Sequence, residues 1–297
     1  MQRWILVAIV VAGCSGSANS VISQVGQLEN KNLDEASGLA RSQRDSNVLW
    51  SMNDDGKPVL YAFDLQGRHL GKVSIDGANN KDWEDLASFT LDETPYLLVA
   101  DIGDNDARRK TRRLYVVEEP RPDDKNVDIA WQIRFSYAEG PRDIEAVAVD
   151  TDTATVLLLS KREIPAVLYS LPLRSGTDEV LIAERLGAVT SLPQPSRSDV
   201  QMAPKTDDWY WQPTGMDIAA DNLSAIVLTY AGVYYYRRDA EQSWIDAFER
   251  RPMGVGLNKL RNAEAICFND SGSAAYVTVE KKRAPLIRID LTGVQTQ

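Results

Sequence analysis

The sequence predicts an all-β fold, a β-propeller of five four-stranded blades closed by strands from both termini. Three observations carry this prediction: a short motif recurs five times, β-type runs follow each copy, and no segment keeps a helical periodicity. The chain has 297 residues, which exceeds the usual size of one domain but suits a single propeller.

The N-terminus is predicted to be a signal peptide, residues 1–13. Arg3 supplies a positive charge, and the apolar run 4–12 that follows is too short to span a bilayer. The tetrad Val11-Ala12-Gly13-Cys14 resembles the bacterial lipobox, which implies lipidation of Cys14. Ser15 after it lacks the aspartate associated with inner-membrane retention, so by the same resemblance the outer membrane is favoured. The alternative is an ordinary cleavage site that happens to end at a cysteine.

Residues 14–24 are then expected to form a tether, because residues 15–24 are rich in Ser and Gly. Residues 25–297 are expected to form one propeller domain. No further apolar run is long enough to cross a membrane, which predicts a protein anchored in the periplasm rather than inserted. Cys267 would be left without a disulfide partner and is expected to be an inert core residue.

The recurring motif consists of a polar anchor residue, a small or short residue and an apolar residue. Its five copies are residues 36–40, 83–87, 144–148, 213–217 and 263–267, and their anchors are Ser37, Glu84, Glu145, Thr214 and Glu264. The chain ends too soon after the last anchor to complete a repeat, and the residues before the first anchor supply the missing length. Strands from the two termini are therefore expected to share one blade.

Two runs rich in β-branched and aromatic residues follow each anchor, separated by turn-forming residues. They are residues 48–52 and 59–63, 96–100 and 113–117, 156–160 and 166–170, 225–229 and 232–236, and 275–279 and 285–289. A more polar fourth strand follows in most repeats, for example residues 71–75 and 131–135. Residues 190–212, dense in Pro, Ser, Gln and Asp, suggest a long insertion. The alternative architecture has six blades, with a degenerate blade in the long interval between Glu145 and Thr214.

The first strand of each propeller blade lines the central channel, so the five anchors should converge at one mouth. Glu84, Glu145 and Glu264 would repel one another there unless protons or a cation intervene. With Ser37 and Thr214 they form a predicted site for a hard divalent cation, calcium, which takes about 6 to 8 oxygen ligands. The alternative is neutralisation by basic residues of neighbouring loops, namely Lys161, Arg162, Lys281 and Lys282.

The loops on the same face supply a predicted ligand-binding set: Asp101, Asp104, Asn105, Lys161 and Arg162. Asn53-Asp54-Asp55-Gly56 is expected to be an ordinary turn. The basic run 108–113 is expected to be a solvated loop, with anion binding as the alternative. His69 is expected in a surface turn on the opposite face.

The anchors follow an order of hydroxyl, acid, acid, hydroxyl, acid, and in this they resemble the SdiA-regulated family of bacterial five-bladed propellers. The resemblance covers roughly residues 21–294 as a repeat architecture and breaks at the insertion 190–212. The segments 82–85 and 101–105 are similar to those of secreted propellers, and a more distant likeness runs to esterase-like phytase domains. These resemblances imply a calcium-binding ring and do not specify an activity.

The composition narrows the function further. A net charge of −10 disfavours nucleic acid as a partner, and a single histidine disfavours histidine zinc sites and histidine-dependent hydrolases. We expect a lipid-anchored periplasmic propeller whose acidic, calcium-binding funnel binds a small ligand or partner protein. The alternative is a metal-dependent hydrolase of phosphoesters or sugars that uses the same carboxylates. No nucleophile motif marks a catalytic residue.

Overall fold

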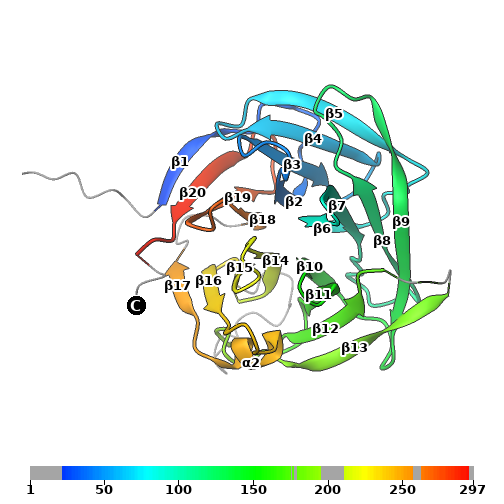
Figure 1. The fold of residues 1–297 in the computed structure, drawn as a ribbon, viewed down its shortest axis with the longest axis vertical. Helices are drawn as coiled ribbons and strands as arrows, with labels where there is room; N and C mark the ends of the chain where they lie inside the picture. Colours follow the sequence, from blue (N-terminus) through cyan, green and yellow to red (C-terminus); the bar gives the residue numbers. More distant parts are fainter. Residues whose placement is uncertain (1–21, 175, 177–178, 195–210, 257–261, 294–297) are drawn as a thin grey trace, which may run out of the picture.

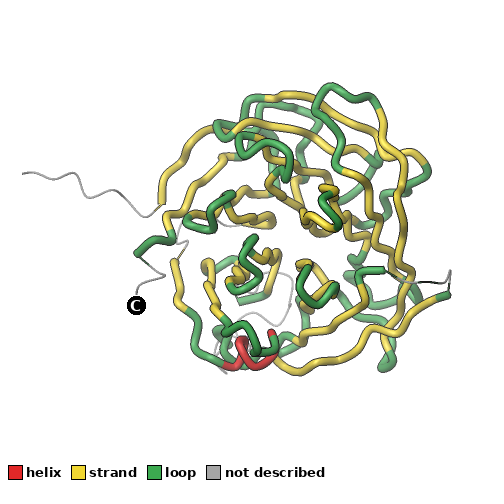
Figure 2. Tube along the Cα trace, in the orientation of Figure 1, coloured by secondary structure: helices red, strands yellow, loops and turns green. Residues whose placement is uncertain are grey.

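In the computed structural model, strands are arranged around a central axis (Figures 1 and 2). The structure describes residues 22–174, 176, 179–194, 211–256 and 262–293. The predicted signal peptide, Cys14 and most of the predicted insertion 190–212 lie outside the described residues, so those predictions are not tested.

The strands of the described residues form five antiparallel groups of four. The first group is β2 (Ala36–Arg41), β3 (Val48–Asn53), β4 (Val59–Asp64) and β5 (His69–Asp76). The second is β6 (Trp83–Leu91), β7 (Thr94–Asp101), β8 (Arg112–Glu118) and β9 (Asn126–Tyr137). The third is β10 (Ile144–Asp150), β11 (Thr155–Ser160), β12 (Val167–Pro172) and β13 (Val180–Ala188). The fourth is β14 (Pro213–Ile218), β15 (Ser224–Thr229), β16 (Gly232–Arg237) and β17 (Met253–Gly256). The fifth is β18 (Ala263–Phe268), β19 (Ala274–Val279), β20 (Pro285–Asp290) and β1 (Ile22–Gln27).

Strands from the two ends of the chain close the ring, which confirms the predicted closure. β1 runs antiparallel to β20, with Ile22 opposite Ile289 and Gln27 opposite Pro285. Because β1 begins at Ile22, residues 22–24 belong to a strand and not to the tether in which we expected them. The division of the chain into signal peptide, tether and domain otherwise stays a prediction.

The inner strands β2, β6, β10, β14 and β18 neighbour one another in that order, and β18 returns to β2. This arrangement confirms the all-β propeller architecture. The number of blades stays a prediction, because residues 195–210 of the interval proposed for a sixth blade lie outside the described ranges.

The apolar core lies in layers between neighbouring strand groups. Between the first and second groups, for example, Trp50 and Met52 pack in one cluster with Trp83, Leu97 and Tyr115. The inner three strands of a group are buried on both faces, which explains their nearly continuous apolar sequences. The outer strands β5 and β9 alternate more strongly because one face meets solvent. Cys267 is fully buried and carries no disulfide, as predicted.

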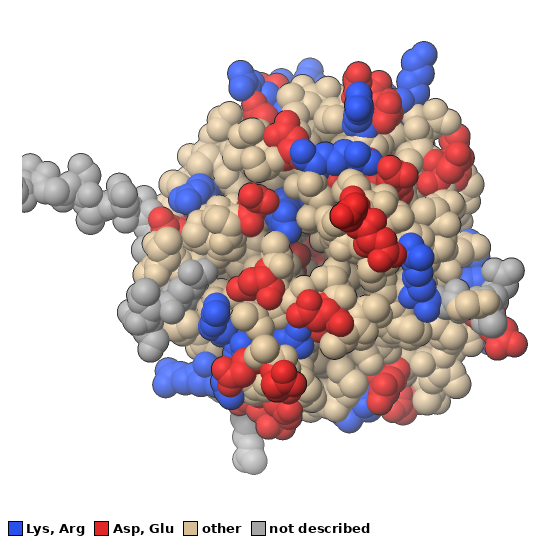
Figure 3. All heavy atoms as spheres, in the orientation of Figure 1, with Lys and Arg blue, Asp and Glu red and all other residues tan. Residues whose placement is uncertain are grey.

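Other elements lie at the periphery. The helix α2 (Trp244–Glu249) connects β16 to β17 near the rim (Figure 1). Parallel pairing of β9 with both β5 and β13 joins the first three groups along their outer edges. Within the described ranges, no helix has the length and apolar character needed to cross a membrane. On the face seen in Figure 3, acidic side chains are spread widely with basic ones between them.

Candidate functional site

The five predicted anchors occupy equivalent positions, because each is the extra residue of a β-bulge. In β6, Trp83 pairs with Asp101 and Asp85 with Ala100, so Glu84 has no partner on β7. The same break in register occurs in the other four inner strands, at Ser37, Glu145, Thr214 and Glu264. A bulge redirects a side chain without ending its strand. The repeated motif therefore marks a shared backbone feature at one end of the inner strands.

Two of the three anchor glutamates lie together with an aspartate that the sequence analysis did not single out. One oxygen from each of Glu84, Asp143 and Glu145 lies within 4.8 Å of the others. Glu84 and Glu145 are 9% and 4% exposed. A Cβ atom on Gly103 would come within 2.0 Å of Glu84 Oε1, so only glycine allows this close approach. These three carboxylates form a group that can hold a metal ion, and we call it the mouth cluster.

Lys161 is the main counter-ion of the mouth cluster. Its buried ammonium donates a hydrogen bond to Glu145 Oε2, and it lies 5.7 Å from the centre of the Tyr230 ring. Tyr230 donates its hydroxyl hydrogen to Glu264 Oε1 at 2.6 Å. Burial lowers the pKa of Lys161, but Glu145 and Glu264 outweigh this effect and raise it well above its usual value. The predicted neutralisation by a neighbouring lysine is therefore present for Glu145.

Burial favours the protonated forms of three carboxyl groups at the mouth, those of Glu84, Glu145 and Asp82. Burial, followed by the charges of Glu145 and Asp82, raises the pKa of Glu84 well above its ordinary value. Burial also raises the pKa of Glu145, although the Lys161 ammonium opposes this rise. Asp82 has a raised pKa, chiefly through burial, and shares a hydrogen bond with Glu84. Burial thus favours protons on Glu84, Glu145 and Asp82 even though Lys161 lies among them.

The two hydroxyl anchors contact the neighbouring inner strand. Ser37 donates a hydrogen bond to the carbonyl oxygen of Trp83 at 2.6 Å. Thr214 donates in the same way to the carbonyl oxygen of Ala263 at 2.7 Å. These contacts tie β2 to β6 and β14 to β18, which is a structural role. Metal ligation by Ser37 and Thr214 stays a prediction.

The predicted ligand-binding loop is an ion-pair network. Asp101 pairs with Arg109 at 2.7 Å, and Asp104 pairs with Arg112 at 2.5 Å. The side chains of Arg109 and Arg112 are 11% and 1% exposed. The prediction of a solvated loop over residues 108–113 is therefore wrong for these two arginines, because buried carboxylates require paired charges.

A second part of the network joins this loop to the mouth cluster. Arg162 donates to Asn105 Oδ1 and pairs with Asp143 at 2.6 Å. The backbone N–H of Asp104 also donates to Asp143 Oδ1 at 3.0 Å. The structure thus brings all five predicted ligand-binding residues near the mouth cluster and gives each of them a protein partner.

A polar residue with a side-chain oxygen stands two positions before every anchor, a signal that the sequence analysis did not use. These residues are Glu35, Asp82, Asp143, Gln212 and Asn262. Gln212 is 1% exposed, and neither amide atom has a hydrogen-bond partner within the described part of the chain. It lines a small hollow beside Lys161. Unsatisfied buried polar groups often mark a place for water or an ion.

A second acidic group lies in the first strand group, just before β2 and just after β3. Glu35, Asp54 and Asp55 bring their carboxylate oxygens within 4.8 Å of one another. Burial, reinforced by the charges of Glu35 and Glu280, raises the pKa of Asp54 to about 7. The turn predicted at residues 53–56 therefore contains an aspartate, Asp54, whose pKa is raised by burial and by the charges of Glu35 and Glu280.

Two further carboxylates, Asp85 and Asp217, hold the inner strands together beside the mouth. Asp85 is fully buried and accepts backbone N–H bonds from Leu86, Val147 and Met216 at 2.8, 2.8 and 3.2 Å. It therefore joins β6 to β10 and β14. Asp217 accepts from the N–H groups of Ile218 and Phe268, which joins β14 to β18.

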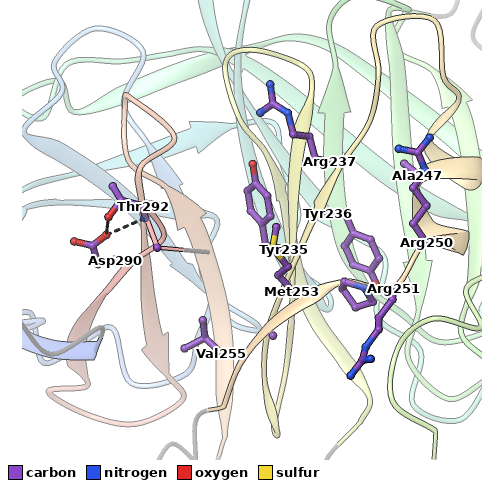
Figure 4. Close-up of a pocket in the computed structure, with 13 residues that line it drawn as sticks. Tyr235, Tyr236, Arg237, Ala247, Arg250, Arg251, Met253, Val255, Asp290 and Thr292 are labelled. Carbon is purple, nitrogen blue, oxygen red and sulfur yellow. Dashed lines mark hydrogen bonds between the residues drawn. The ribbon is translucent and has the colours of Figure 1, made fainter. Parts of the chain in front are cut away.

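A larger groove lies away from these residues, between β16, β17, α2 and the end of β20 (Figure 4). Its volume is about 1260 Å³. Figure 4 shows Tyr235, Tyr236 and Met253 along it, and Asp290 at one side bonded to Thr292. The groove borders residues outside the described ranges and is lined by none of the predicted site residues, so we assign it no function.

Comparison with known proteins identifies the fold and not the activity. The chain is similar to the crystal structure of the major Malassezia sympodialis allergen Mala s 1, a β-propeller, with a TM-score of 0.55 and 11% identity over 90% of this chain and 96% of that one. The structure of Chaetomium thermophilum Raptor aligns with a TM-score of 0.40 and 13% identity, over 86% of this chain and 20% of that one, which is too weak to argue from. No family model and no curated protein matches the sequence. The SdiA-regulated family thus stays a prediction.

Proposed function

We propose that this chain is a binding protein of the bacterial cell envelope whose mouth cluster holds a divalent cation. Through this cation and the surrounding loops it binds a small ligand or a partner protein without turnover. The observation that carries the proposal is the close approach of the oxygens of Glu84, Asp143 and Glu145 at the mouth of the ring. Carboxylate oxygens are preferred ligands of hard cations.

The balance of charge around the cluster supports a cation. Near the axis there are five carboxyl groups, those of Asp82, Glu84, Asp143, Glu145 and Glu264, and the direct ion pairs to them come from Lys161 and Arg162. Arg109 is nearby but pairs with Asp101. A divalent ion would replace the protons that burial favours on Glu84 and Glu145. Calcium suits such a site because it accepts many oxygen ligands in flexible geometry.

The amide of Gln212, which has no hydrogen-bond partner among the described residues, would supply a neutral oxygen ligand beside Lys161. The competing explanation is that Lys161 already acts as the only cation the ring needs. The two explanations differ in their response to calcium, because a ligand that binds only the folded state stabilises it by mass action.

Calcium is expected to raise the melting temperature of the parent protein, and Glu84→Gln should remove most of this rise. At a calcium concentration about 100 times the dissociation constant, the increase should be roughly 5 °C. Glu84 is the preferred target because it forms no ion pair with the described basic residues, whereas Glu145→Gln would also break the contact with Lys161. Calorimetry in calcium and in chelator measures both proteins.

Glu93→Gln is the matched control, since Glu93 is exposed in the turn between β6 and β7. It should keep the full calcium response. A parent that melts identically in calcium and in chelator would mean that Lys161 and Arg162 are the counter-ions of the cluster, and it would contradict the metal proposal. Calcium-dependent turnover of phosphoester or sugar substrates would instead support the hydrolase alternative.

The proposal of a lipid anchor in the outer membrane rests on the tetrad Val11-Ala12-Gly13-Cys14. Cys14→Ser is expected to abolish incorporation of labelled palmitate and to leave the precursor unprocessed, because the thiol is the acylated group. Cys267→Ser, which changes the buried cysteine, should still be labelled. If the parent takes up no label, the anchor is absent, and the calcium experiment is unaffected by that result.

A further inference from the structure

A small basic pocket lies in the second strand group, beside the ion-pair network of Asp101, Arg109 and Arg112. Its volume is about 170 Å³. It is lined by five basic residues and one acid, with polar side chains between them: Lys81, Arg109, Arg112, Arg113, Arg134, Asp101, Asn79, Thr111 and Tyr115. Such a concentration of positive charge is unexpected in a chain with a net charge of −10.

Only part of this charge is compensated by the protein. Arg109 pairs with Asp101, and Arg112 pairs with Asp104. Lys81, Arg113 and Arg134 form no ion pair with any residue that the structure describes. The one carboxylate that lines the hollow, Asp101 on β7, lies opposite Arg113 but pairs with Arg109, so three cationic groups there form no ion pair of their own.

The fold places two of these positive groups, Arg113 and Arg134, next to each other despite their mutual repulsion. Arg113 on β8 lies directly opposite Arg134 on β9 in the antiparallel register. Like charges in this position destabilise a pair of strands. Both side chains are partly buried, so solvent screens them less than it would at an exposed site. An anion between them would turn the repulsion into attraction.

Arg113 is also oriented in advance by neutral partners. Its Nη1 donates to the Tyr115 hydroxyl at 3.3 Å, and its guanidinium lies 5.6 Å from the centre of the Tyr115 ring. That hydroxyl in turn accepts from the backbone N–H of Asn79 at 3.2 Å and donates to the Asn79 carbonyl at 3.3 Å. The tyrosine thus positions the guanidinium while leaving its charge available.

We infer that this pocket binds an oxyanion, a phosphate or the terminal phosphoryl group of a larger molecule. Arginine guanidinium groups match the oxygens of phosphate with paired N–H donors. Three uncompensated cations suit a dianion better than a single carboxylate. The volume is below the roughly 300 to 1,000 Å³ of pockets for drug-sized ligands, so it fits an anionic group and not a whole cofactor. This inference is independent of the cation site.

The test is titration calorimetry of the purified full chain with inorganic phosphate at constant ionic strength. The parent is expected to show saturable binding at one site. Arg134→Gln should weaken it at least about tenfold, because it removes a charge-assisted contact. Arg121→Gln is the matched control, since Arg121 lies in the loop after the other end of β8, is exposed, and is not among the lining residues. It should bind phosphate as the parent does.

A second measurement separates binding from a structural role. Without phosphate, Arg134→Gln should melt no lower than the parent, because it relieves the repulsion with Arg113. A lower melting temperature would mean that Arg134 supports the fold and would overturn the inference. So would the lack of saturable binding in the parent, or an equal loss of binding in Arg121→Gln.

Glycerol 3-phosphate in place of inorganic phosphate distinguishes the two sources of the anion. Equal or tighter binding assigns the site to a terminal phosphoryl group. Binding of inorganic phosphate alone assigns it to the free anion. If chloride at matched ionic strength displaces the bound ligand as well as phosphate does, the pocket only attracts anions in general, and the inference fails.

Discussion

Removal of β1, residues 22–27, is expected to destabilise the whole ring by roughly 5 kcal/mol or more. β1 is the outer strand of the fifth group, where it pairs along β20 from Pro285 to Ile289. Its loss removes several backbone hydrogen bonds, each worth about 1 kcal/mol, and the packing of Ile22 and Val25 against the core. This amount is a large part of the 5 to 15 kcal/mol that stabilises a typical domain.

The measurement is urea unfolding of the parent and the shortened chain, followed by tryptophan fluorescence. A synthetic peptide of residues 22–27 added to the shortened chain should restore part of the stability, because it can add itself to the open edge of β20. A scrambled peptide of the same composition should not. Unchanged stability of the shortened chain would show that closure by β1 contributes little.

Replacement of Asp85 by alanine is expected to cost at least about 3 kcal/mol. The substitution leaves three backbone N–H groups, those of Leu86, Val147 and Met216, without their acceptor in a fully buried place. Each unsatisfied buried donor costs about 1 to 3 kcal/mol. Because these groups belong to β6, β10 and β14, the loss loosens three inner strands at once.

Asp85→Asn is the matched control, since its amide oxygen can still accept from Val147 and Met216. It should be clearly more stable than Asp85→Ala. Asp217→Ala leaves two donors unpaired and should fall between the parent and Asp85→Ala. Equal stability of the alanine and asparagine variants at position 85 would show that this acceptor is not what holds the strands together.

The architecture could be predicted from the sequence because the repeated motif coincides with a repeated feature of the backbone, a β-bulge. Each anchor, from Ser37 to Glu264, coincides with a bulge at the same position of an inner strand. The strand expected from the other terminus is present as β1, which pairs with β20 in the group that contains Glu264. Alternation of apolar and polar residues does not identify the inner strands, because both faces of these strands are buried. Their β-branched and aromatic composition and the turn residues between them identified them instead.

The candidate site was predicted less completely because pairing partners are set in three dimensions. Asp101 and Arg109 are both visible in the sequence, but nothing in it shows that they neutralise each other. Asp85 is next to an anchor and seemed part of the motif, while the backbone N–H groups that donate to it lie on β10 and β14. Asp143 could have been found, since Asp82 and Asp143 stand at the same offset before Glu84 and Glu145.

The bulges also bear on how such a ring can change over evolutionary time. A bulged residue contributes no pair to the ladder, so its side chain can be exchanged with little effect on strand registration. Five such positions already carry Ser, Glu, Glu, Thr and Glu in this chain. At the three glutamate positions the chemistry of the mouth is thereby separated from the register of the strands, whereas Ser37 and Thr214 also tie neighbouring strands together. Combinatorial replacement of the three glutamates should yield many folded variants with altered ligand preference, which makes the ring a candidate starting point for engineered recognition.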